Sequence, residues 1–254
     1  MTIKILSLIF SALFFSCTDI QEPIEPTVQI SALIEKSRAL QVRGDKIEQS
    51  LLQKKDSIEV QLMKHKQQNQ AINQKDFVNL LEISENFVLD MRYATTNNFL
   101  KEKVYSCAQC YVRKEVAKAL VAANDDLIKK GYKIKLFDCY RPYSVQKKMW
   151  KIFPNPGYVA DPKGGSIHNK GAAVDISLVK LDGSSVDMGT TYDHFGKEAH
   201  HSYQKLPKEV LEHRKLLRET MQYHGFSTIK TEWWHYNFKS TIRYSISDFK
   251  WKCT

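Results

Sequence analysis

The chain has 254 residues, of which 43% are hydrophobic, so it can bury a core of its own and is not disordered throughout. Its 10 glycines and 7 prolines exclude a collagen-like or Gly/Pro-rich low-complexity chain. The net charge of +10 raises the question of nucleic-acid binding, but the basic residues are scattered and often interleaved with glutamates. We therefore expect a solvated, mildly basic surface and no nucleic-acid partner.

The N-terminal residues 1–16 are typical of an export signal. Lys4 precedes an almost wholly apolar segment, 5–15, of about 11 residues, which is too short to span a bilayer as a helix. Ser16 then precedes Cys17, as in a bacterial lipoprotein signal, so we expect cleavage after residue 16 and lipidation of Cys17. Plain secretion is the alternative. Either way the mature chain is expected outside the cytoplasm, facing the periplasm, with the lipid as its membrane contact.

Two segments without a folded-domain composition follow. Residues 17–27 contain two prolines and are interpreted as a flexible tether. Residues 28–76 are rich in Gln, Lys and Glu and carry a narrow apolar stripe at Leu33, Leu40, Ile47, Leu51 and Ile58. This spacing predicts a helical spacer, with a coiled-coil oligomerisation module as the weaker alternative because polar residues and Gly44 interrupt the stripe. The oligomeric state stays open.

A folded domain is expected over 77–254. Apolar periodicity, proline and glycine positions predict three helices, over 112–130, 144–152 and 207–225. Alternating or continuous apolar runs predict four strands, over 87–91, 132–136, 172–178 and 233–238. Because these elements lack a regular strand–helix–strand period, we expect an α+β fold, with a small, mainly antiparallel sheet and flanking helices behind a helical stalk.

Four cysteines lie in this domain: Cys107, Cys110, Cys139 and Cys253. An even number in an oxidising compartment favours two disulfides, and three connectivities are open. The alternative is that Cys107 and Cys110, spaced as C-x-x-C, form a redox pair or half of a zinc site. The chain has no second C-x-x-C, so structural disulfides are preferred.

Three segments carry candidate chemistry. In the first, His168 lies in a Gly-flanked stretch and Asp175 follows within an alternating strand. Together they could form half of a zinc site, because imidazole nitrogen and carboxylate oxygen both suit that ion. A loop histidine and a solvent-facing aspartate are the simpler interpretation. In the second, Glu232 and His235 are three residues apart, and both can reach one site only if the strand bends or bulges. In the third, Arg141 precedes a proline at a strand end and can offer its planar guanidinium to an oxyanion.

Taken together, Ser-x-His-x(6)-Asp, Glu-x-x-His near the C-terminus and Tyr-Arg-Pro upstream resemble the zinc D-alanyl-D-alanine dipeptidases of the VanX type. The resemblance runs from about residue 87 to 238 and includes, in order, the segments RYATTNNF from Arg92 and MGTTYD from Met188. It implies the fold of the D-Ala-D-Ala metallopeptidases, which is hedgehog-like. Cys139 stands where the best-known members carry Gly, so the loop that carries Arg141 is expected to be cross-linked differently here.

The resemblance also implies roles for individual side chains. A single Zn²⁺ would be bound by His168, Asp175 and His235, with a fourth position left for water. Glu232 would take the proton of that water and pass it to the leaving amine, while Arg141 would stabilise the oxyanion. Asp193 would pair with the ammonium of the substrate, with help from Tyr93, and Ser166 would line the pocket.

The leading functional hypothesis is therefore zinc-dependent hydrolysis of free D-Ala-D-Ala, in dipeptide recycling or in glycopeptide resistance. A D,D- or L,D-carboxypeptidase that trims peptidoglycan stems is the first alternative. Asp193 discriminates between them, because a dipeptidase needs an anion for the substrate's amino terminus and a carboxypeptidase needs an open cleft there. A non-catalytic, zinc-stabilised wall-binding module is the second alternative, and Glu232 argues against it because binding needs no proton shuttle.

Overall fold

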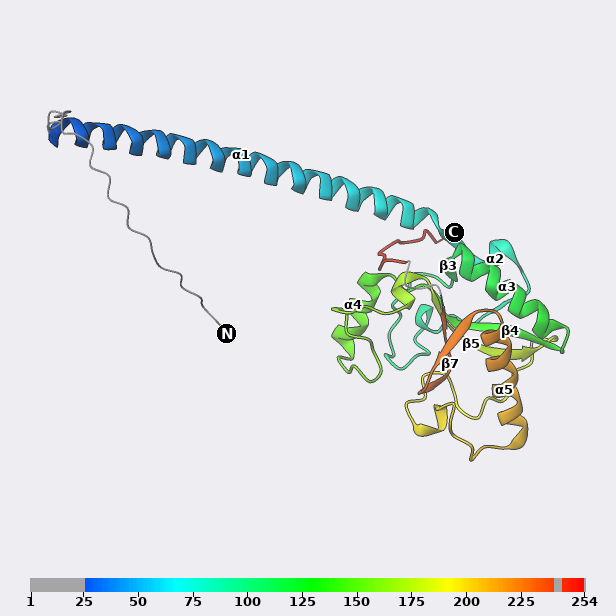
Figure 1. Ribbon diagram of the computed structural model, residues 1–254. Helices are drawn as coiled ribbons and strands as arrows, with labels where there is room; N and C mark the ends of the chain where they lie inside the picture. Colours follow the sequence, from blue (N-terminus) through cyan, green and yellow to red (C-terminus); the bar gives the residue numbers. More distant parts are fainter. Residues whose placement is uncertain (1–25, 240–243, 254) are drawn as a thin grey trace, which may run out of the picture. The chain divides into compact units, whose positions relative to one another are not determined.

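The computed structural model describes residues 26–239 and 244–253, and the chain divides into two compact units, 1–63 and 64–254. The predicted signal, most of the tether and Cys17 lie outside the described residues. The predicted spacer is helical: α1 runs from Pro26 to Lys75 as one helix (Figure 1). Its apolar stripe is unpartnered, since Leu33 and Ile58 are 66% and 63% exposed. Among the described helices, none combines the length and the apolar character that crossing a membrane requires.

The second unit is built from short strands and helices. The strands are β1 (Phe77–Asn79), β2 (Val88–Leu89), β3 (Tyr111–Arg113), β4 (Tyr132–Asp138), β5 (Ala173–Lys180), β6 (Phe226–Ile229) and β7 (Glu232–Phe238). The α-helices are α2 (Leu80–Ile83), α3 (Lys114–Ile128), α4 (Tyr143–Ile152) and α5 (Lys208–Tyr223). Three turns of 3₁₀-helix complete the unit: η1 (Arg92–Ala94), η2 (His168–Lys170) and η3 (Lys197–Ala199).

A five-stranded sheet with the order β2-β4-β5-β7-β6 forms the centre of this unit. Every neighbouring pair is antiparallel except β2 with β4, and β1 and β3 form a separate antiparallel pair. The predicted α+β class and the mainly antiparallel sheet are confirmed. The central strand β5 is buried on both faces up to Val179, so its Asp175 is not solvent-facing as the simpler interpretation had it.

Helices α3 and α5 pack against each other and against the sheet (Figure 1). The predicted apolar face of α3 is buried, with Leu120 and Leu127 fully inaccessible, and such burial contributes about 1.5–3 kcal/mol per large apolar side chain. The helix predicted from residue 112 begins at Lys114, because the residues before it pair with β1 instead. Helix α5 begins directly after Pro207, as predicted.

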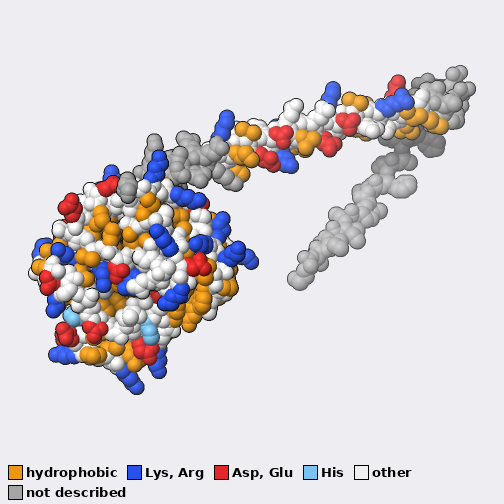
Figure 2. Space-filling model, turned by 180° about the vertical axis from the view of Figure 1, so that it is seen from behind, with side chains coloured by type: hydrophobic (Ala, Val, Ile, Leu, Met, Phe, Trp, Pro, Cys, Tyr) orange, Lys and Arg blue, Asp and Glu red, His pale blue; other side chains and the backbone are white. Residues whose placement is uncertain are grey.

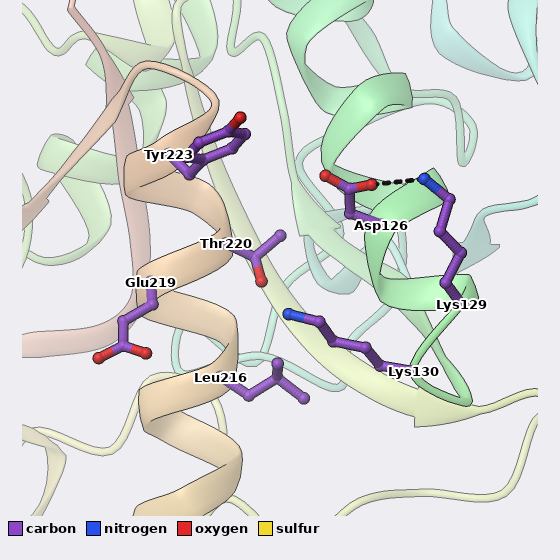
Figure 3. A pocket seen from close by; sticks show the side chains of 7 residues that line it. All are labelled: Asp126, Lys129, Lys130, Leu216, Glu219, Thr220 and Tyr223. Carbon is purple, nitrogen blue, oxygen red and sulfur yellow. Dashed lines mark hydrogen bonds and ion pairs between the residues drawn. The ribbon is translucent and has the colours of Figure 1, made fainter.

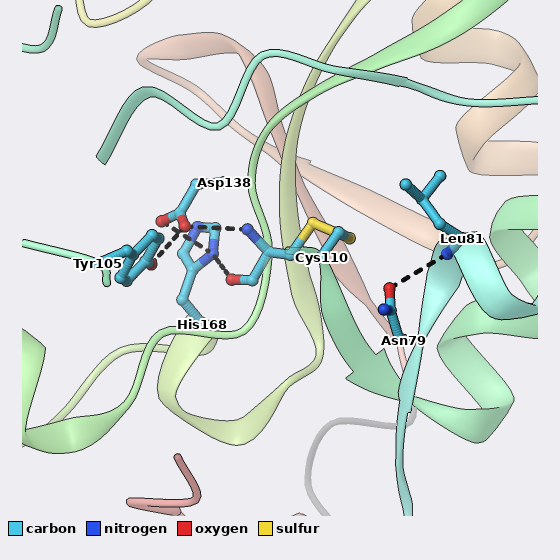
Figure 4. The surroundings of a disulfide bond; sticks show 7 residues. Asn79, Leu81, Tyr105, Cys110, Asp138 and His168 are labelled. Carbon is cyan, nitrogen blue, oxygen red and sulfur yellow. Dashed lines mark hydrogen bonds and ion pairs between the residues drawn. A yellow bond between two sulfur atoms is a disulfide. The ribbon is translucent and has the colours of Figure 1, made fainter. Parts of the chain in front are cut away.

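The C-terminal segment 244–253 contains neither helix nor strand and is held to the domain by side chains and by a disulfide. The indole of Trp251 stacks on Tyr111, with ring centroids 5.4 Å apart. Ser247 donates its backbone N–H to the carbonyl of Asn169, beside the His168 turn. Cys107 pairs with Cys253, and Cys110 pairs with Cys139 (Figure 4 shows the surroundings of the second bond). The alternative in which the C-x-x-C cysteines act together is therefore wrong: each is bonded to a distant cysteine.

Basic and acidic side chains are interspersed on the face of the domain that Figure 2 displays. On α5, ion pairs join residues one helical turn apart, such as Lys208 with Glu212 and Lys215 with Glu219. Exposed pairs of this kind contribute little to stability. They agree with the expected solvated surface.

Candidate metallopeptidase site

Three elements bring His168, Asp175 and His235 together. His168 opens the turn η2, which ends at Gly171 with φ +71°; a Cβ there would collide with the ring of Phe77, so the position requires glycine. Asp175 and His235 lie directly opposite each other on the neighbouring strands β5 and β7. All three side chains are buried, and within the described residues they form the one group of three or more such side chains whose ligand atoms lie within 4.8 Å of one another.

Each of the two imidazoles uses one ring nitrogen for a hydrogen bond outside the triad. This bond determines whether the other ring nitrogen, which faces the triad, has a lone pair. The carbonyl of Cys139 accepts a hydrogen bond from Nδ1 of His168 at 2.7 Å, so Nε2 of that ring carries a lone pair when the ring is neutral. The amide oxygen of Asn237 likewise accepts from Nε2 of His235 at 2.9 Å, which leaves a lone pair on Nδ1. These two nitrogens are 3.2 Å apart and lie 3.3 and 2.9 Å from Oδ1 of Asp175.

Three lone-pair atoms that face one another in a buried place need a cation between them. A tetrahedral ion with ligand bonds of roughly 2.0–2.1 Å has its ligands about 3.3 Å apart, which is close to two of the separations, 3.2 and 3.3 Å, while the third, 2.9 Å, is shorter. Two imidazole nitrogens and one carboxylate oxygen are also donors that Zn²⁺ accepts. The residues present therefore fit the zinc ion that the resemblance implies. Tyr192 holds the second oxygen of Asp175, donating its hydroxyl at 2.9 Å, and so orients that carboxylate.

Glu232 reaches the triad because strand β7 is irregular at this point. Thr228 of β6 pairs with Tyr236 while the next residue, Ile229, pairs with Glu232, so β7 has extra residues between these pairs. The predicted bulge is confirmed, and it brings Oε2 of Glu232 to 3.9 Å from Nδ1 of His235. Burial raises the pKa of Glu232, the imidazole of His235 opposes this rise, and the Asp175 carboxylate adds to it. A glutamate with a raised pKa is better suited to accept a proton from water and to release it again.

Arg141 is buried and held by two partners that the sequence did not single out. Its Nε and Nη2 donate to Oδ2 of Asp138 at 3.1 and 2.5 Å, and its Nη1 donates to Oε1 of Gln146 at 2.9 Å. Tyr105 donates its hydroxyl to the other oxygen of Asp138 at 2.5 Å. The guanidinium is therefore fixed in orientation on one side of the pocket that also contains the triad.

Asp193 lies in the same pocket with the hydroxyl of Tyr93 donating to it, at 3.2 Å from Oδ2. Its backbone is in the left-handed region, φ 58°, which few residues other than glycine adopt and which aspartate tolerates better than most. Burial raises the pKa of Asp193 well above its usual range, and the Asp175 carboxylate adds to this; a cationic partner in the pocket would stabilise its ionised form. Ser166 also lines the pocket, and its Oγ accepts the N–H of His168 at 3.2 Å.

The pocket that contains these side chains has a volume of about 280 Å³. Its apolar walls come from the aromatic rings of Tyr158, Phe195 and Trp234. This volume lies just below the range of pockets for drug-sized ligands, roughly 300–1,000 Å³, so it suits a ligand of dipeptide size.

A larger cavity of about 440 Å³ lies elsewhere, between the end of α3 and α5 (Figure 3). Its polar groups include the exposed Lys129–Asp126 ion pair, and it contains none of the candidate site residues.

Four positions that contact candidate residues escaped prediction: Asp138, Gln146, Tyr192 and Asn237. Each contacts a candidate residue rather than the pocket centre, so the residue type alone carries no signal. Asp138 and Tyr192 do stand inside the segments that carry the resemblance, next to Cys139 and Asp193, and this proximity was the available clue.

Two imidazoles and a carboxylate around one cation position, with a glutamate in reach, define the site of a zinc-dependent peptidase. The family model of D-Ala-D-Ala dipeptidases, Peptidase_M15, matches residues 73–250, and the chain belongs to this family of metallopeptidases.

Individual relatives agree with this family. The D-alanyl-D-alanine dipeptidase of Escherichia coli (strain K12) is 29% identical over 178 residues, covering 70% of this chain and 92% of its own. The D-alanyl-D-alanine dipeptidase of Enterococcus faecalis (strain ATCC 700802 / V583) is 32% identical over 171 residues, covering 58% of this chain and 83% of its own. Among solved structures, the LdcB LD-carboxypeptidase matches 51% of this chain and 61% of its own, with 25% identity and a TM-score of 0.36.

Proposed function

We propose that this chain hydrolyses free D-Ala-D-Ala to two D-alanines and uses one Zn²⁺ per chain, held by His168, Asp175 and His235. The observation that carries the proposal is the position of Asp193, whose carboxylate lies with Tyr93 in a small pocket that also contains the triad. An anion there suits the free ammonium of a dipeptide. Relatives named D-alanyl-D-alanine dipeptidase support the same substrate.

The side chains of the pocket divide the reaction among them. When bound, Zn²⁺ supplies Lewis acidity that polarises the peptide carbonyl and makes water a nucleophile near neutral pH. Glu232 takes the proton of the attacking water and returns it to the leaving amine, which its raised pKa favours. Arg141, fixed by Asp138, offers N–H groups to the oxygen that becomes negative in the transition state. Asp193 binds the substrate ammonium and so sets the register of the peptide bond.

The test compares three substrates with the full chain, with and without added Zn²⁺: D-Ala-D-Ala, N-acetyl-D-Ala-D-Ala and a peptidoglycan stem pentapeptide. We expect cleavage of the free dipeptide and a loss of at least about tenfold in kcat/KM on acetylation, because the ammonium is lost and the Asp193 carboxylate is left unpaired. Cleavage of the pentapeptide in preference to the dipeptide would establish a D,D- or L,D-carboxypeptidase instead. Zinc binding without cleavage of any substrate would favour a wall-binding module.

We further propose that the chain is exported, cleaved after residue 16 and anchored by lipid on Cys17. The support is the signal-like segment 1–16 and its small residue before the cysteine. Outside the cytoplasm the enzyme would meet dipeptide released from the wall rather than the cytoplasmic precursor, so recycling is favoured over glycopeptide resistance. Labelling with a radioactive fatty acid should mark the wild type and not Cys17→Ser; equal labelling of both would contradict the anchor.

A further inference from the structure

The disulfide between Cys110 and Cys139 lies beside the site and joins the segment before β3 to the segment that follows β4. On the first side, the carbonyl of Cys110 accepts the N–H of Leu80 at 2.8 Å, and the strand that follows it, β3, pairs with β1. Both sulfur-bearing residues are fully buried. Figure 4 shows Asp138, Tyr105 and His168 gathered on one side of this disulfide.

On the second side, Cys139 stands where the regular ladder of strand β4 has ended. The pairing of β4 with β5 shifts register after Leu136 and stops at Asp138. Beyond that point, the backbone bonds that hold the segment include Tyr140 N–H to Tyr111 at 2.8 Å and Arg141 N–H to His168 at 3.1 Å. The second of these is a bond within the site itself. The Cys110–Cys139 disulfide adds a covalent attachment to these hydrogen bonds, at the residue whose carbonyl contacts His168.

The same segment sets the orientation of two groups of the proposed reaction. The carbonyl of Cys139 accepts the hydrogen bond from Nδ1 of His168 that leaves the other ring nitrogen free to bind metal. On one side of Cys139 is Asp138, and two residues beyond it is Arg141, which that carboxylate orients. Movement of the Cys139 peptide would thus displace a metal ligand and the oxyanion-binding arginine together.

We infer that the Cys110–Cys139 disulfide positions His168 and Arg141, so that the site is fully assembled when these cysteines are oxidised. This inference rests on the proposed function. Reduction by a dithiol breaks the S–S bond, transfers two electrons and two protons to give two thiols, and converts the dithiol to its cyclic disulfide. In a reducing compartment the two cysteines remain thiols, so hydrolysis would be suppressed until the chain reaches an oxidising one. A dipeptidase controlled in this way would spare D-Ala-D-Ala in the compartment where the chain is made.

The test measures zinc affinity by chelator competition, together with kcat and KM, on the full chain. The double variant C110A/C139A is compared with C107A/C253A, which removes the disulfide of the C-terminal segment. We expect C110A/C139A to lose about 10–100-fold in zinc affinity and at least about tenfold in kcat, with a smaller change in KM, at equal folded fraction. C107A/C253A should retain zinc affinity within about threefold. Zinc affinity and kcat per folded molecule within about twofold of wild type in C110A/C139A would overturn the inference.

A second measurement decides the question if C110A/C139A does not fold. In the C107A/C253A background, dithiothreitol can act on Cys110–Cys139 alone, and reduction of this disulfide raises the titrated thiol count by two; the dithiothreitol, which itself binds Zn²⁺, is removed before zinc affinity is measured. We expect zinc affinity to fall when the two thiols appear and to return on reoxidation. Two new thiols with unchanged zinc affinity would overturn the inference. Zinc affinity is measured without substrate, so a failure of the proposed dipeptidase activity would be seen separately.

Discussion

The hydroxyl of Tyr93 lies 3.2 Å from Oδ2 of Asp193, although the two residues are 100 positions apart in the chain. Tyr93 is itself buried, 2% exposed, and comes from the turn η1, while Asp193 comes from the loop between β5 and α5. The phenol holds the carboxylate towards the pocket. In the function we propose, this carboxylate binds the free amino terminus of the dipeptide.

Replacing Asp193 with Asn should specifically weaken the binding of the free dipeptide. The loss of one partner of a desolvated charge pair costs about 2 kcal/mol or more, so kcat/KM for D-Ala-D-Ala should fall at least roughly thirtyfold, mainly through KM. Tyr93→Phe keeps the carboxylate and removes one hydrogen bond, so a fall of about two- to tenfold is expected. Steady-state kinetics with N-acetyl-D-Ala-D-Ala is the control. An equally large effect of D193N on the acetylated substrate would contradict the ammonium pairing.

Replacing Arg141 with Lys should lower kcat by about 10²–10³ with little change in KM, because the planar fork that binds the developing oxyanion is lost. Arg92→Lys is the matched control: this arginine pairs with Asp90 at 2.9 Å, is partly exposed and does not line the pocket of the triad. Its kcat should stay within about twofold of wild type. Similar losses in both variants would indicate a general effect of replacing arginine and not oxyanion stabilisation.

Glu232→Gln keeps the shape of the side chain and removes its ability to carry a proton. We expect a fall in kcat of about 10²–10⁴, because that is the usual contribution of a general base, while the variant still binds zinc. Kinetics and zinc analysis on the same preparation separate the two properties. Turnover within about tenfold of wild type in a zinc-loaded E232Q sample would show that another group moves the proton.

His201 should make stability depend on pH in the acidic range. Burial, with the neighbouring Arg218 and Arg214 charges, lowers the pKa of His201 to about 4 from its ordinary value near 6.5. Between these values the unfolded chain binds the proton and the folded chain does not, so stability rises with pH from about 4 to 6.5 and is lost as pH falls through that window. In urea unfolding, the free energy of unfolding of His201→Gln should depend less steeply on pH than that of the wild type. An unchanged slope would show that His201 does not cause this pH dependence.

Removing residues 1–63 should leave the folded domain intact. The apolar side chains of α1 between Ile30 and Met63 are exposed, so this part of the helix buries little that could stabilise the rest. We expect the Tm of the 64–254 chain to lie within about 2 °C of the full chain and kcat to be unchanged. Calorimetry checks the first and the dipeptide assay the second. A large fall in Tm would place the stalk within the cooperative unit.

Much of the fold was predictable because its helices and strands carry local signals. The apolar periodicity of α3 and α5 and the proline or glycine at their ends located both helices within a few residues. The three residues of the metal triad were reached only through the resemblance to the VanX-type dipeptidases, because residue type and spacing alone left a loop histidine and a solvent-facing aspartate as the simpler interpretation. The irregularity of β7 at Glu232 could be foreseen because Glu232 and His235 reach one site only if the strand bends or bulges.

What could not be predicted depends on contacts between distant segments. The four cysteines allow three pairings, and only the approach of β3 to the end of β4 selects Cys110 with Cys139. The role of Asp138 follows from three residues that donate hydrogen bonds to it, Tyr105, Cys139 and Arg141, and none of these contacts has a spacing rule. The full burial of β5 likewise arises from layers on both of its faces, which an alternating pattern does not reveal.

The number of zinc ions bound per chain tests the central claim most directly. Chelator-treated full-length protein is titrated with Zn²⁺ by calorimetry, for the wild type and for His168→Ala/His235→Ala, which removes both imidazoles of the triad. The account predicts one high-affinity site per chain in the wild type and none in the double variant. Wild-type protein without such a site, or a double variant that binds one zinc ion with unchanged affinity, would contradict it.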